Sequence, residues 1–353
     1  MEKYIAAGIM SGTSLDGLDI ALCGFIYDKN HWQFEILEAE TLTYSEFWRN
    51  RLFNAHKLKG LELLKLHAAY GRFIGQSVKD FLKKKKIQVD LIASHGHTVF
   101  HAPADNITFQ LGAGASISAI TGIKTISDFR SMDVALGGQG APLVPVGDKL
   151  LFGEYDFCLN LGGFANISYD RNGKRMAFDI CPVNIVLNHL ANRFHKRYDK
   201  NGELGRLGKP NHELLDGLNN LPYYQRIPPK SLSREWLEHN IYPLFDNCGL
   251  KDEDIITTFY EHAAHQISME IGKPEHKNGL ITGGGAYNQF LVDKLREKCN
   301  IQLTLPQKEI IEYKEALIFA FLGILRNKNL VNCWSSVTGA ERDNKGGIIH
   351  ESY

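Results

Sequence analysis

The sequence predicts an α/β protein built from two similar halves, and three observations support this. Short apolar segments typical of buried strands alternate with longer segments in which apolar residues recur at helical spacing. Two glycine-rich turns, residues 11–17 and 162–166, each lie between apolar strands and are separated by about half the chain. The 353 residues also exceed what a single hydrophobic core usually holds. We therefore expect two domains that share a cleft.

The first half is expected to begin with a β-hairpin. Residues 4–10 and 18–26 are apolar, and the segment between them consists almost entirely of Gly, Ser, Thr and Asp. A third strand is expected over residues 33–43, and apolar residues at helical spacing predict a long helix over 58–86. The other elements expected in this half are strands over 89–93, 107–111 and 123–127 and a helix over 116–121.

The second half repeats this order of elements. Residues 156–161 and 167–169 predict a second hairpin, and 175–179 a third strand. Helices over 184–197, 254–270 and 290–298 and a strand over 279–282 complete the pattern, and the Tyr- and Pro-rich residues 222–230 predict a surface loop. The expected domains are 1–130 with the tail 334–353, and 131–333.

Composition excludes several classes of protein. Lys+Arg and Asp+Glu both total 40, so no basic excess points to a nucleic-acid partner or an anionic membrane. No apolar run approaches the roughly 18 residues that span a bilayer. The six cysteines are scattered without a Cys-x-x-Cys pair, which argues against a zinc module and fits a reducing cytoplasm. We expect a cytoplasmic protein.

The first turn has the composition of a phosphate-binding hairpin. Glycines allow close approach of the backbone to a ligand, and N–H and hydroxyl groups can converge on an anion. Asp16 and Asp19 would repel a bare phosphate, so they predict a bridging divalent cation, Mg²⁺. An ordinary polar hairpin tip is the alternative. The other residues expected to contact the nucleotide are Ser11, Gly12, Thr13, Ser14 and Gly17.

A run of three glycines, Gly283, Gly284 and Gly285, follows the strand expected at 279–282 and precedes an amphipathic segment. Such a run at a strand–helix junction lets a base or ribose lie against the backbone. A tight turn would explain one glycine, but three favour ligand binding.

Four further side chain types are candidates for the chemistry. Asp179 ends a strand just before a helix, which suits a general base or, alternatively, a helix N-cap. Arg130, flanked by acids and close to a glycine-rich segment, could clamp an anion or form a surface ion pair. His95 and His97 favour substrate hydrogen bonding over metal binding, because no acidic ligand is nearby. Glu315 could face either solvent or the cleft.

Seven motifs in this order resemble the anhydro-N-acetylmuramic acid kinase family, and they cover nearly the whole chain. They are MSGTSLDGLD at 10–19, SHG at 94–96 with Thr98, DFR at 128–130, GGQGAPLVP at 137–145, NLGG at 160–163 with Asn166, GGGAYN at 283–288 and VTGA at 337–340. The resemblance implies two related actin-like, ribonuclease H-like domains, each a mixed sheet with flanking helices, around a cleft for ATP and Mg²⁺.

The resemblance also implies an activity. The family opens 1,6-anhydro-N-acetylmuramic acid with water and phosphorylates its O6, a step of peptidoglycan recycling. Asp179 matches the catalytic base and Arg130 a sugar contact, and a homodimer is expected. The resemblance also places Gly162 and Gly163 at a second phosphate hairpin. We further expect Asn166 at the nucleotide, and His95, His97, Asn184 and Glu315 at the sugar.

This chain departs from the family pattern beside the base. The family usually has glycines where Cys181 and Val183 stand, so added side chains are expected next to Asp179. A histidine is also common where this chain has Gly147-Asp148. Two alternatives to the activity implied by the resemblance stay open. One is a kinase of the same superfamily that acts on another sugar, and the other is an ATP-gated binding protein without catalysis.

Overall fold

The computed structural model describes residues 1–12 and 15–352. The chain divides into two compact units, Met1–Phe152 with Tyr313–Tyr353, and Gly153–Glu312. The first unit thus includes residues 131–152, which the sequence assigned to the second domain, and most of the long helix near the C-terminus. No helix among the described residues combines the length and the apolar character that a membrane span requires.

A six-stranded mixed sheet forms the centre of the first unit, in the order β13-β7-β4-β1-β2-β3. The expected hairpin and third strand are present, since β1, β2 and β3 pair antiparallel, while β4 pairs parallel to β1 and β7 parallel to β4. Its strands are β1 (Glu2–Ser11), β2 (Gly17–Asp28), β3 (His31–Thr43), β4 (Leu91–Ser94), β7 (Thr125–Ser127) and β13 (Ile348–His350).

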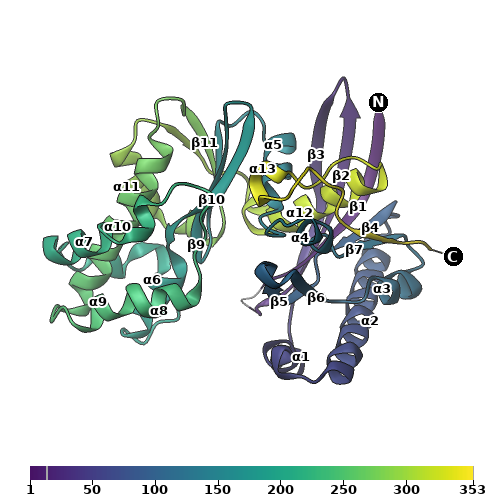
Figure 1. Cartoon of the computed structure of the whole chain (residues 1–353), viewed down its shortest axis with the longest axis horizontal. Coiled ribbons are helices and arrows are strands. Elements are labelled where there is room, and N and C mark those ends of the chain that lie inside the picture. The colour runs from purple at the N-terminus through teal and green to yellow at the C-terminus, as the bar shows by residue number, and fades with distance from the viewer. Residues whose placement is uncertain (13–14, 353) are drawn as a thin grey trace. The chain divides into compact units, whose positions relative to one another are not determined.

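Helices cover both faces of this sheet because successive strand residues point to opposite sides. Ile9 on β1 belongs to a core shared with α2 (Gly60–Lys85), the helix that runs beside the sheet in Figure 1. Gly8 faces α12 (Lys308–Asn327) on the other side, where a Cβ would lie 1.8 Å from the Ala316 carbonyl oxygen. The absence of a side chain at Gly8 therefore lets α12 lie close to the sheet.

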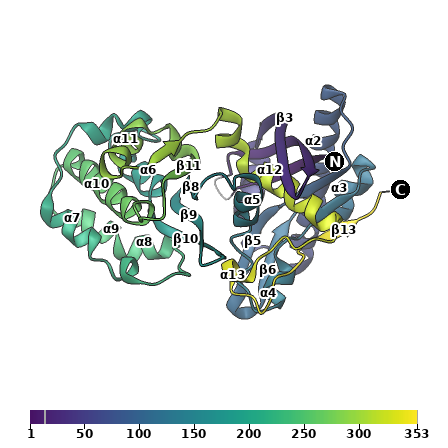
Figure 2. The ribbon, with the colours of Figure 1, turned by 90° about the horizontal axis from the view of Figure 1, so that it is seen from above.

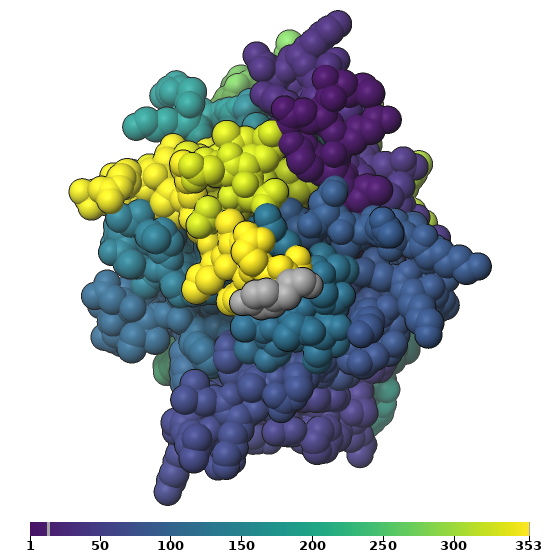
Figure 3. Space-filling model, turned by 90° about the vertical axis from the view of Figure 1, so that its right-hand side faces the viewer, coloured from purple at the N-terminus to yellow at the C-terminus, as the bar shows by residue number. Residues whose placement is uncertain are grey.

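The C-terminal segment completes the first unit. β13 pairs antiparallel with β7, and the Ser127 hydroxyl lies 3.0 Å from His350 Nε2. Figure 3 shows this yellow segment against the blue residues of the first half of the chain. The remaining elements are α1 (Glu46–Phe53), β5 (His97–Ala102), β6 (Ile107–Leu111), α3 (Gly114–Thr121), α4 (Ser131–Ala135), α5 (Val144–Leu151) and α13 (Ser335–Thr338).

A five-stranded sheet forms the second unit, in the order β10-β9-β8-β11-β12. An antiparallel hairpin and third strand are again followed by two parallel strands, so both sheets have the same order apart from the added β13. This confirms the expected pair of related α/β domains of the ribonuclease H-like class. The strands are β8 (Phe157–Leu161), β9 (Phe164–Arg171), β10 (Lys174–Pro182), β11 (Asn278–Thr282) and β12 (Gln302–Thr304).

The helices of the second unit gather on one side of its sheet, as Figure 2 shows, and enclose one hydrophobic core. α10 lies at the centre of this layer and packs against its neighbouring helices and β10. Its helices are α6 (Asn184–Asn192), α7 (His212–Asn219), α8 (Arg234–Asn240), α9 (Tyr242–Asp246), α10 (Asp252–Ile271) and α11 (Gln289–Lys298).

Candidate functional site

The candidate residues of the first unit gather where three parallel strands end. β1, β4 and β7 end at Ser11, Ser94 and Ser127. The residue after β4 is His95, and Arg130 lies in the turn that follows β7. Because parallel strands present their carboxyl ends at one edge of a sheet, the structure brings these residues to that edge.

Ser11 is tied into the core by a chain of hydrogen bonds. Its hydroxyl accepts from the Tyr44 hydroxyl at 2.8 Å and lies 3.2 Å from His97 Nδ1. Tyr44 in turn lies 2.6 Å from the Tyr70 hydroxyl, and all four residues are buried. Burial lowers the pKa of His97 to about 4, so the ring is neutral at physiological pH and can accept from Ser11. This chain anchors the end of β1 from which the hairpin starts.

The acidic residues of the hairpin differ in exposure. Asp16 is exposed, whereas Asp19 is partly buried on β2 and accepts a hydrogen bond from Thr41 Oγ1 at 2.6 Å. Gly17 packs tightly, since a Cβ there would lie 2.7 Å from the Leu42 carbonyl oxygen. The Gly12 carbonyl accepts from Leu15 N at 3.3 Å within the turn.

Thr13 and Ser14, two of the residues expected to bind phosphate, lie outside the described residues.

Arg130 is partly buried and held on two sides. Its Nε and one terminal nitrogen lie 3.1 and 2.7 Å from His95 Nε2, and the other terminal nitrogen donates to the Gly140 carbonyl oxygen at 2.6 Å. Burial lowers the pKa of Arg130 to about 10, while Glu315 and Asp133 act to raise it, so the guanidinium stays charged at neutral pH.

Glu315 lies on α12 and is accessible to solvent, although the surrounding protein partly desolvates its carboxyl group. The protein atoms around it raise the pKa of Glu315, whereas Arg130 and Lys314 act to lower it. Arg130 and Glu315 therefore interact electrostatically.

In the second unit, a row of polar side chains crosses four neighbouring strands. Asn166 on β9 is paired with Asp179 on β10 and with Asn160 on β8, and Asn160 is paired in turn with Thr282 on β11. Residues paired across neighbouring strands present their side chains on the same face of the sheet. The row therefore brings the candidate base and the candidate Asn166 onto one face.

Asp179 is a strand residue rather than a helix cap. The N-cap of α6 is Val183, so the alternative N-cap role of Asp179 is wrong. The Asp179 carboxylate accepts from Leu232 N at 3.0 Å, its backbone carbonyl accepts from the Tyr223 hydroxyl at 2.6 Å, and its N–H donates to the Lys230 carbonyl at 3.2 Å. Burial raises the pKa of Asp179, against the lowering effect of the Leu232 N–H.

The glycines of the second unit converge around Asn184. Its side chain donates to the Leu161 carbonyl oxygen at 3.0 Å, and its N–H donates to Gly162 O at 3.3 Å. Val183 N donates to Gly163 O at 2.8 Å, which ties the hairpin turn to the start of α6. The triplet lies beside them: a Cβ on Gly285 would be 3.3 Å from Asn184 Nδ2.

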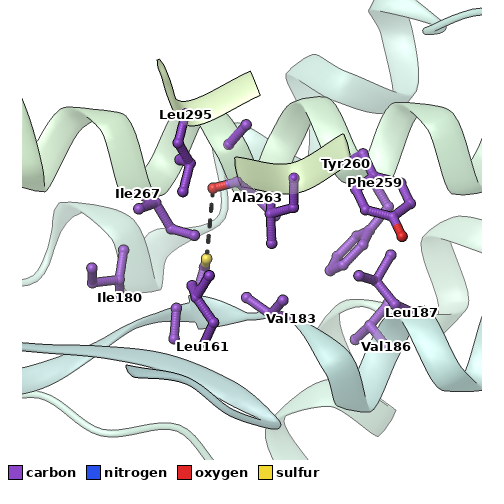
Figure 4. Close-up of a cluster of buried hydrophobic side chains, with 14 of the residues drawn as sticks. Leu161, Ile180, Val183, Val186, Leu187, Phe259, Tyr260, Ala263, Ile267 and Leu295 are labelled. Atoms are coloured by element: carbon purple, nitrogen blue, oxygen red, sulfur yellow. Dashed lines mark hydrogen bonds between the residues drawn. The ribbon is translucent and has the colours of Figure 1, made fainter. Parts of the chain in front are cut away.

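The side chains of Cys181 and Val183 lie in the core, not beside the base as expected. A β-bulge between Asp179 and Cys181 breaks the alternation of β10, so Ile180 and Cys181 are both buried. Figure 4 shows the Cys181 sulfur directed at the Ala263 carbonyl oxygen on α10, 3.9 Å away, with Val183 packed nearby. The two departures from the family pattern therefore enlarge the hydrophobic core.

At Gly147-Asp148, where the family commonly has a histidine, this chain has one member of a buried ion pair. Asp148 on α5 lies 2.7 Å from Lys314 Nζ on α12, and both side chains are only 6% exposed. Lys314 also lies over the Phe152 ring. The carboxylate at position 148 is thus matched by a cation from a residue far away in sequence.

Sequence reasoning missed several residues of the candidate site. Asn160 and Thr282 complete the polar row. The signal was a polar residue at or next to the end of an otherwise apolar strand, one or two positions before a glycine. Thr282 Oγ1 is buried without a hydrogen-bond partner among the described residues. Residues 222–230, expected to be a surface loop, hold the Asp179 backbone through Tyr223 and Lys230, and Leu232 just after them binds its carboxylate. No local pattern in the sequence indicates these contacts.

Comparison with known proteins matches the whole chain to one family. A family model described as anhydro-N-acetylmuramic acid kinase matches residues 2–352. An anhydro-N-acetylmuramic acid kinase of Sulfurimonas denitrificans is 33% identical, covering 99% of this chain and 100% of that protein. Proteins of the same name from Synechocystis (30% identical, 97% of each chain) and Haemophilus influenzae (33% identical, 97% of this chain and 96% of that protein) are also similar.

Proposed function

Because the chain belongs to the anhydro-N-acetylmuramic acid kinase family, we propose that it is an ATP-dependent kinase of that sugar. It hydrolyses the internal 1,6-anhydro bond and phosphorylates O6, which yields N-acetylmuramic acid 6-phosphate for peptidoglycan recycling. The observation that carries this proposal beyond family membership is Asp179, a partly buried carboxylate with a raised pKa in a polar row. Such a group can take a proton in the reaction.

The chemistry assigned to Asp179 is proton abstraction from water. Water attacks the anomeric carbon and loses a proton to the Asp179 carboxylate, while the bond from that carbon to O6 breaks. The electron pair released on O6 forms the new bond to the γ-phosphorus of ATP, and the bond to the ADP oxygen breaks. One water, one sugar and one ATP thus give the phosphosugar, ADP and a proton.

Arg130 is assigned to the carboxylate of the sugar's lactyl group. Its charged guanidinium suits a carboxylate, and His95 and Gly140 fix its orientation. His97, by contrast, is committed to Ser11, which supports the hairpin rather than the sugar. Asn184 and Glu315 remain proposed sugar contacts.

The phosphates are assigned to the hairpin of the first unit and to the turn at Gly162 and Gly163 of the second, with adenosine at the glycine triplet. Mg²⁺ prefers one or two carboxylates together with phosphate oxygens, and Asp16 and Asp19 fit that donor set. When bound, Mg²⁺ would neutralise charge on the transferring phosphoryl group. Thr41 would help to position Asp19 for this site, because its hydroxyl donates a hydrogen bond to the Asp19 carboxylate.

Two alternatives can be separated from this proposal by ATP turnover with and without the anhydrosugar. Turnover stimulated by 1,6-anhydro-N-acetylmuramic acid is expected. Stimulation by a different sugar only would favour the divergent kinase, although the burial of Cys181 and Val183 gives no reason for an altered substrate. Slow turnover that no sugar changes would favour an ATP-gated binding protein.

Asp16→Ala is expected to weaken magnesium-dependent ATP binding roughly tenfold, the equivalent of about 1.4 kcal/mol. Asp16 is exposed and lies outside the hydrophobic core, so folding should be retained. Calorimetric titration of ATP with and without Mg²⁺ measures the effect. An unchanged dependence on magnesium would remove Asp16 from the metal site.

Gly284→Val is expected to weaken nucleotide binding by about tenfold or more. Gly284 is exposed, and a Cβ there meets only Asn184 Nδ2, at 4.0 Å, so the added side chain projects outward without disturbing the fold. Gly283→Val is the comparison variant, since Gly283 has φ +82° and a Cβ would lie 2.4 Å from Asn160 Oδ1.

Thermal denaturation and ATP titration of both glycine variants test this difference. Gly283→Val should lose stability, whereas Gly284→Val should keep its melting temperature and lose ATP affinity. Normal ATP binding by a folded Gly284→Val would place adenosine elsewhere.

The sugar, water and ATP are the proposed partners. Three further expectations stay predictions: that the protein is a homodimer, that it has no nucleic-acid or membrane partner, and that it is cytoplasmic. None of the six cysteines, all of which lie in the part of the chain that the structure describes, forms a disulfide, and five of them are buried.

A further inference from the structure

We propose that His95 is a positioning residue, which holds the Arg130 guanidinium in the orientation that receives the carboxylate of the sugar. This inference rests on the proposed function and changes the role expected for His95 from the sequence, which was direct contact with the sugar. The geometry around the guanidinium carries it.

His95 is directed at Arg130 rather than at solvent. Only 5% of His95 is exposed, and its Nε2 lies 3.1 Å from Arg130 Nε and 2.7 Å from one of the terminal nitrogens. Both arginine nitrogens carry hydrogens, so Nε2 must accept. A histidine used in this way has no ring nitrogen left for a sugar hydroxyl.

The other ring nitrogen fixes the tautomer that this role requires. His95 Nδ1 lies 2.9 Å from the Gly96 carbonyl oxygen, which can only accept, so Nδ1 carries the hydrogen and Nε2 is bare. Burial and the charge of Arg130 lower the pKa of His95 well below its usual value, which keeps the ring neutral. Neutral His95 can therefore accept from Arg130 throughout the physiological range.

The backbone around His95 gives it a fixed position. Its N–H donates to the Ile9 carbonyl oxygen at 3.0 Å, which joins it to the end of β1. Its ring packs against Phe319 of α12 with ring centres 4.7 Å apart. The imidazole is thus held by two elements that also form the core of the unit.

A second support holds the opposite side of the guanidinium. Gly140, whose carbonyl accepts from Arg130, donates its own N–H to Asp133 Oδ2 at 2.8 Å. Asp133 is fully buried and accepts from Thr338 and Asn344, both at 2.8 Å. The C-terminal segment therefore anchors Gly140, and His95 and Gly140 together leave Arg130 little freedom.

The two supports leave Arg130 with donors suited to a carboxylate. An arginine side chain has five N–H groups, and the three contacts described above use one on Nε and one on each terminal nitrogen. One N–H on each terminal nitrogen remains. Two such donors match the two oxygens of a carboxylate in a bidentate contact, which is sensitive to the angle of the guanidinium.

The test compares His95→Phe with His95→Gln. Phenylalanine keeps the ring volume but cannot accept, whereas the glutamine Oε1 can reach the position of Nε2. His95→Phe is expected to weaken binding of 1,6-anhydro-N-acetylmuramic acid by roughly 10- to 100-fold, the range of a lost charge-assisted contact. ATP affinity should stay unchanged, and His95→Gln should recover most of the sugar affinity.

Repeating His95→Phe in an Arg130→Leu background separates positioning from a general structural effect. If His95 acts through Arg130, His95→Phe has little further effect on sugar affinity once Arg130 is removed. An equal loss in both backgrounds, or failure of a folded His95→Gln to recover binding, would overturn the inference.

A readout without sugar distinguishes this inference from the proposed function. The Arg130 Nε–H signal in nitrogen-15 NMR should be protected from exchange in the wild type and in His95→Gln, but not in His95→Phe. If the wild type does not bind the sugar, the proposed function fails, and the NMR signal still decides whether His95 fixes Arg130. A signal equally protected in His95→Phe would overturn the positioning role.

Discussion

Asp179→Asn is expected to abolish phosphosugar formation while ATP affinity stays near that of the wild type. The substitution keeps the size of the side chain and an acceptor for Leu232 N, but the amide cannot take a proton from water. Loss of a general base lowers the rate by roughly 10²–10⁴-fold. Product is measured by mass spectrometry, and ATP affinity by calorimetry.

Asp216→Asn is the matched control for this variant. Asp216 is an exposed carboxylate on α7 of the same unit, so the same chemical change is made away from the polar row. Asp216→Asn should retain full activity. Normal product formation by Asp179→Asn would remove Asp179 as the base.

The pH dependence of the wild type gives a second view of Asp179. The base acts in its deprotonated form, and burial raises the pKa of Asp179 above the usual range of an aspartate. The rate should therefore fall as the pH decreases through that raised pKa, at a higher pH than an ordinary carboxylate would give. Asp179→Asn should lose this acid limb in whatever activity remains.

Lys314→Met is expected to lower the free energy of unfolding by about 3–5 kcal/mol. The change removes the ammonium group that pairs with the buried Asp148 carboxylate, while methionine fills a similar volume. A buried carboxylate that loses its cation must either stay charged at low dielectric or take up a proton, and both are unfavourable. Urea denaturation of the two proteins measures the difference.

The double variant Asp148→Leu with Lys314→Met tests whether the cost comes from the unpaired charge. Replacing both members of a buried pair by apolar residues is often neutral or stabilising, so the double variant should regain most of the lost stability. A double variant as unstable as Lys314→Met would show that packing, rather than charge, accounts for the loss. Wild-type stability in Lys314→Met would contradict the role of the pair.

Most of the strands and two of the long helices could be predicted because their signals are local, whereas β5, β12 and β13 were not predicted. The alternation and apolar runs of β1, β2 and β3 located the first hairpin, and the spacing of apolar residues located α2 and α10. The short helices α7, α8 and α9 were missed. They pack into the core through one or two apolar residues each, such as Leu237 on α8, and this gives too little periodicity to recognise.

The site could be predicted only where glycines and polar residues interrupt apolar strands. Asp179 was found from its place at a strand end, but its hydrogen bond to Leu232 joins positions 53 residues apart. The contact between Arg130 and His95 and the pair of Asp148 with Lys314 are likewise set by the packing of distant segments. Even the direction of Cys181 depends on a bulge that shifts the register of β10.

The measurement that tests the central claim most directly is transfer of the γ-phosphoryl group from labelled ATP to 1,6-anhydro-N-acetylmuramic acid. The wild type should form N-acetylmuramic acid 6-phosphate, and Asp179→Asn should form none under the same conditions. A folded protein that binds ATP but transfers no label to this sugar would contradict the proposed substrate.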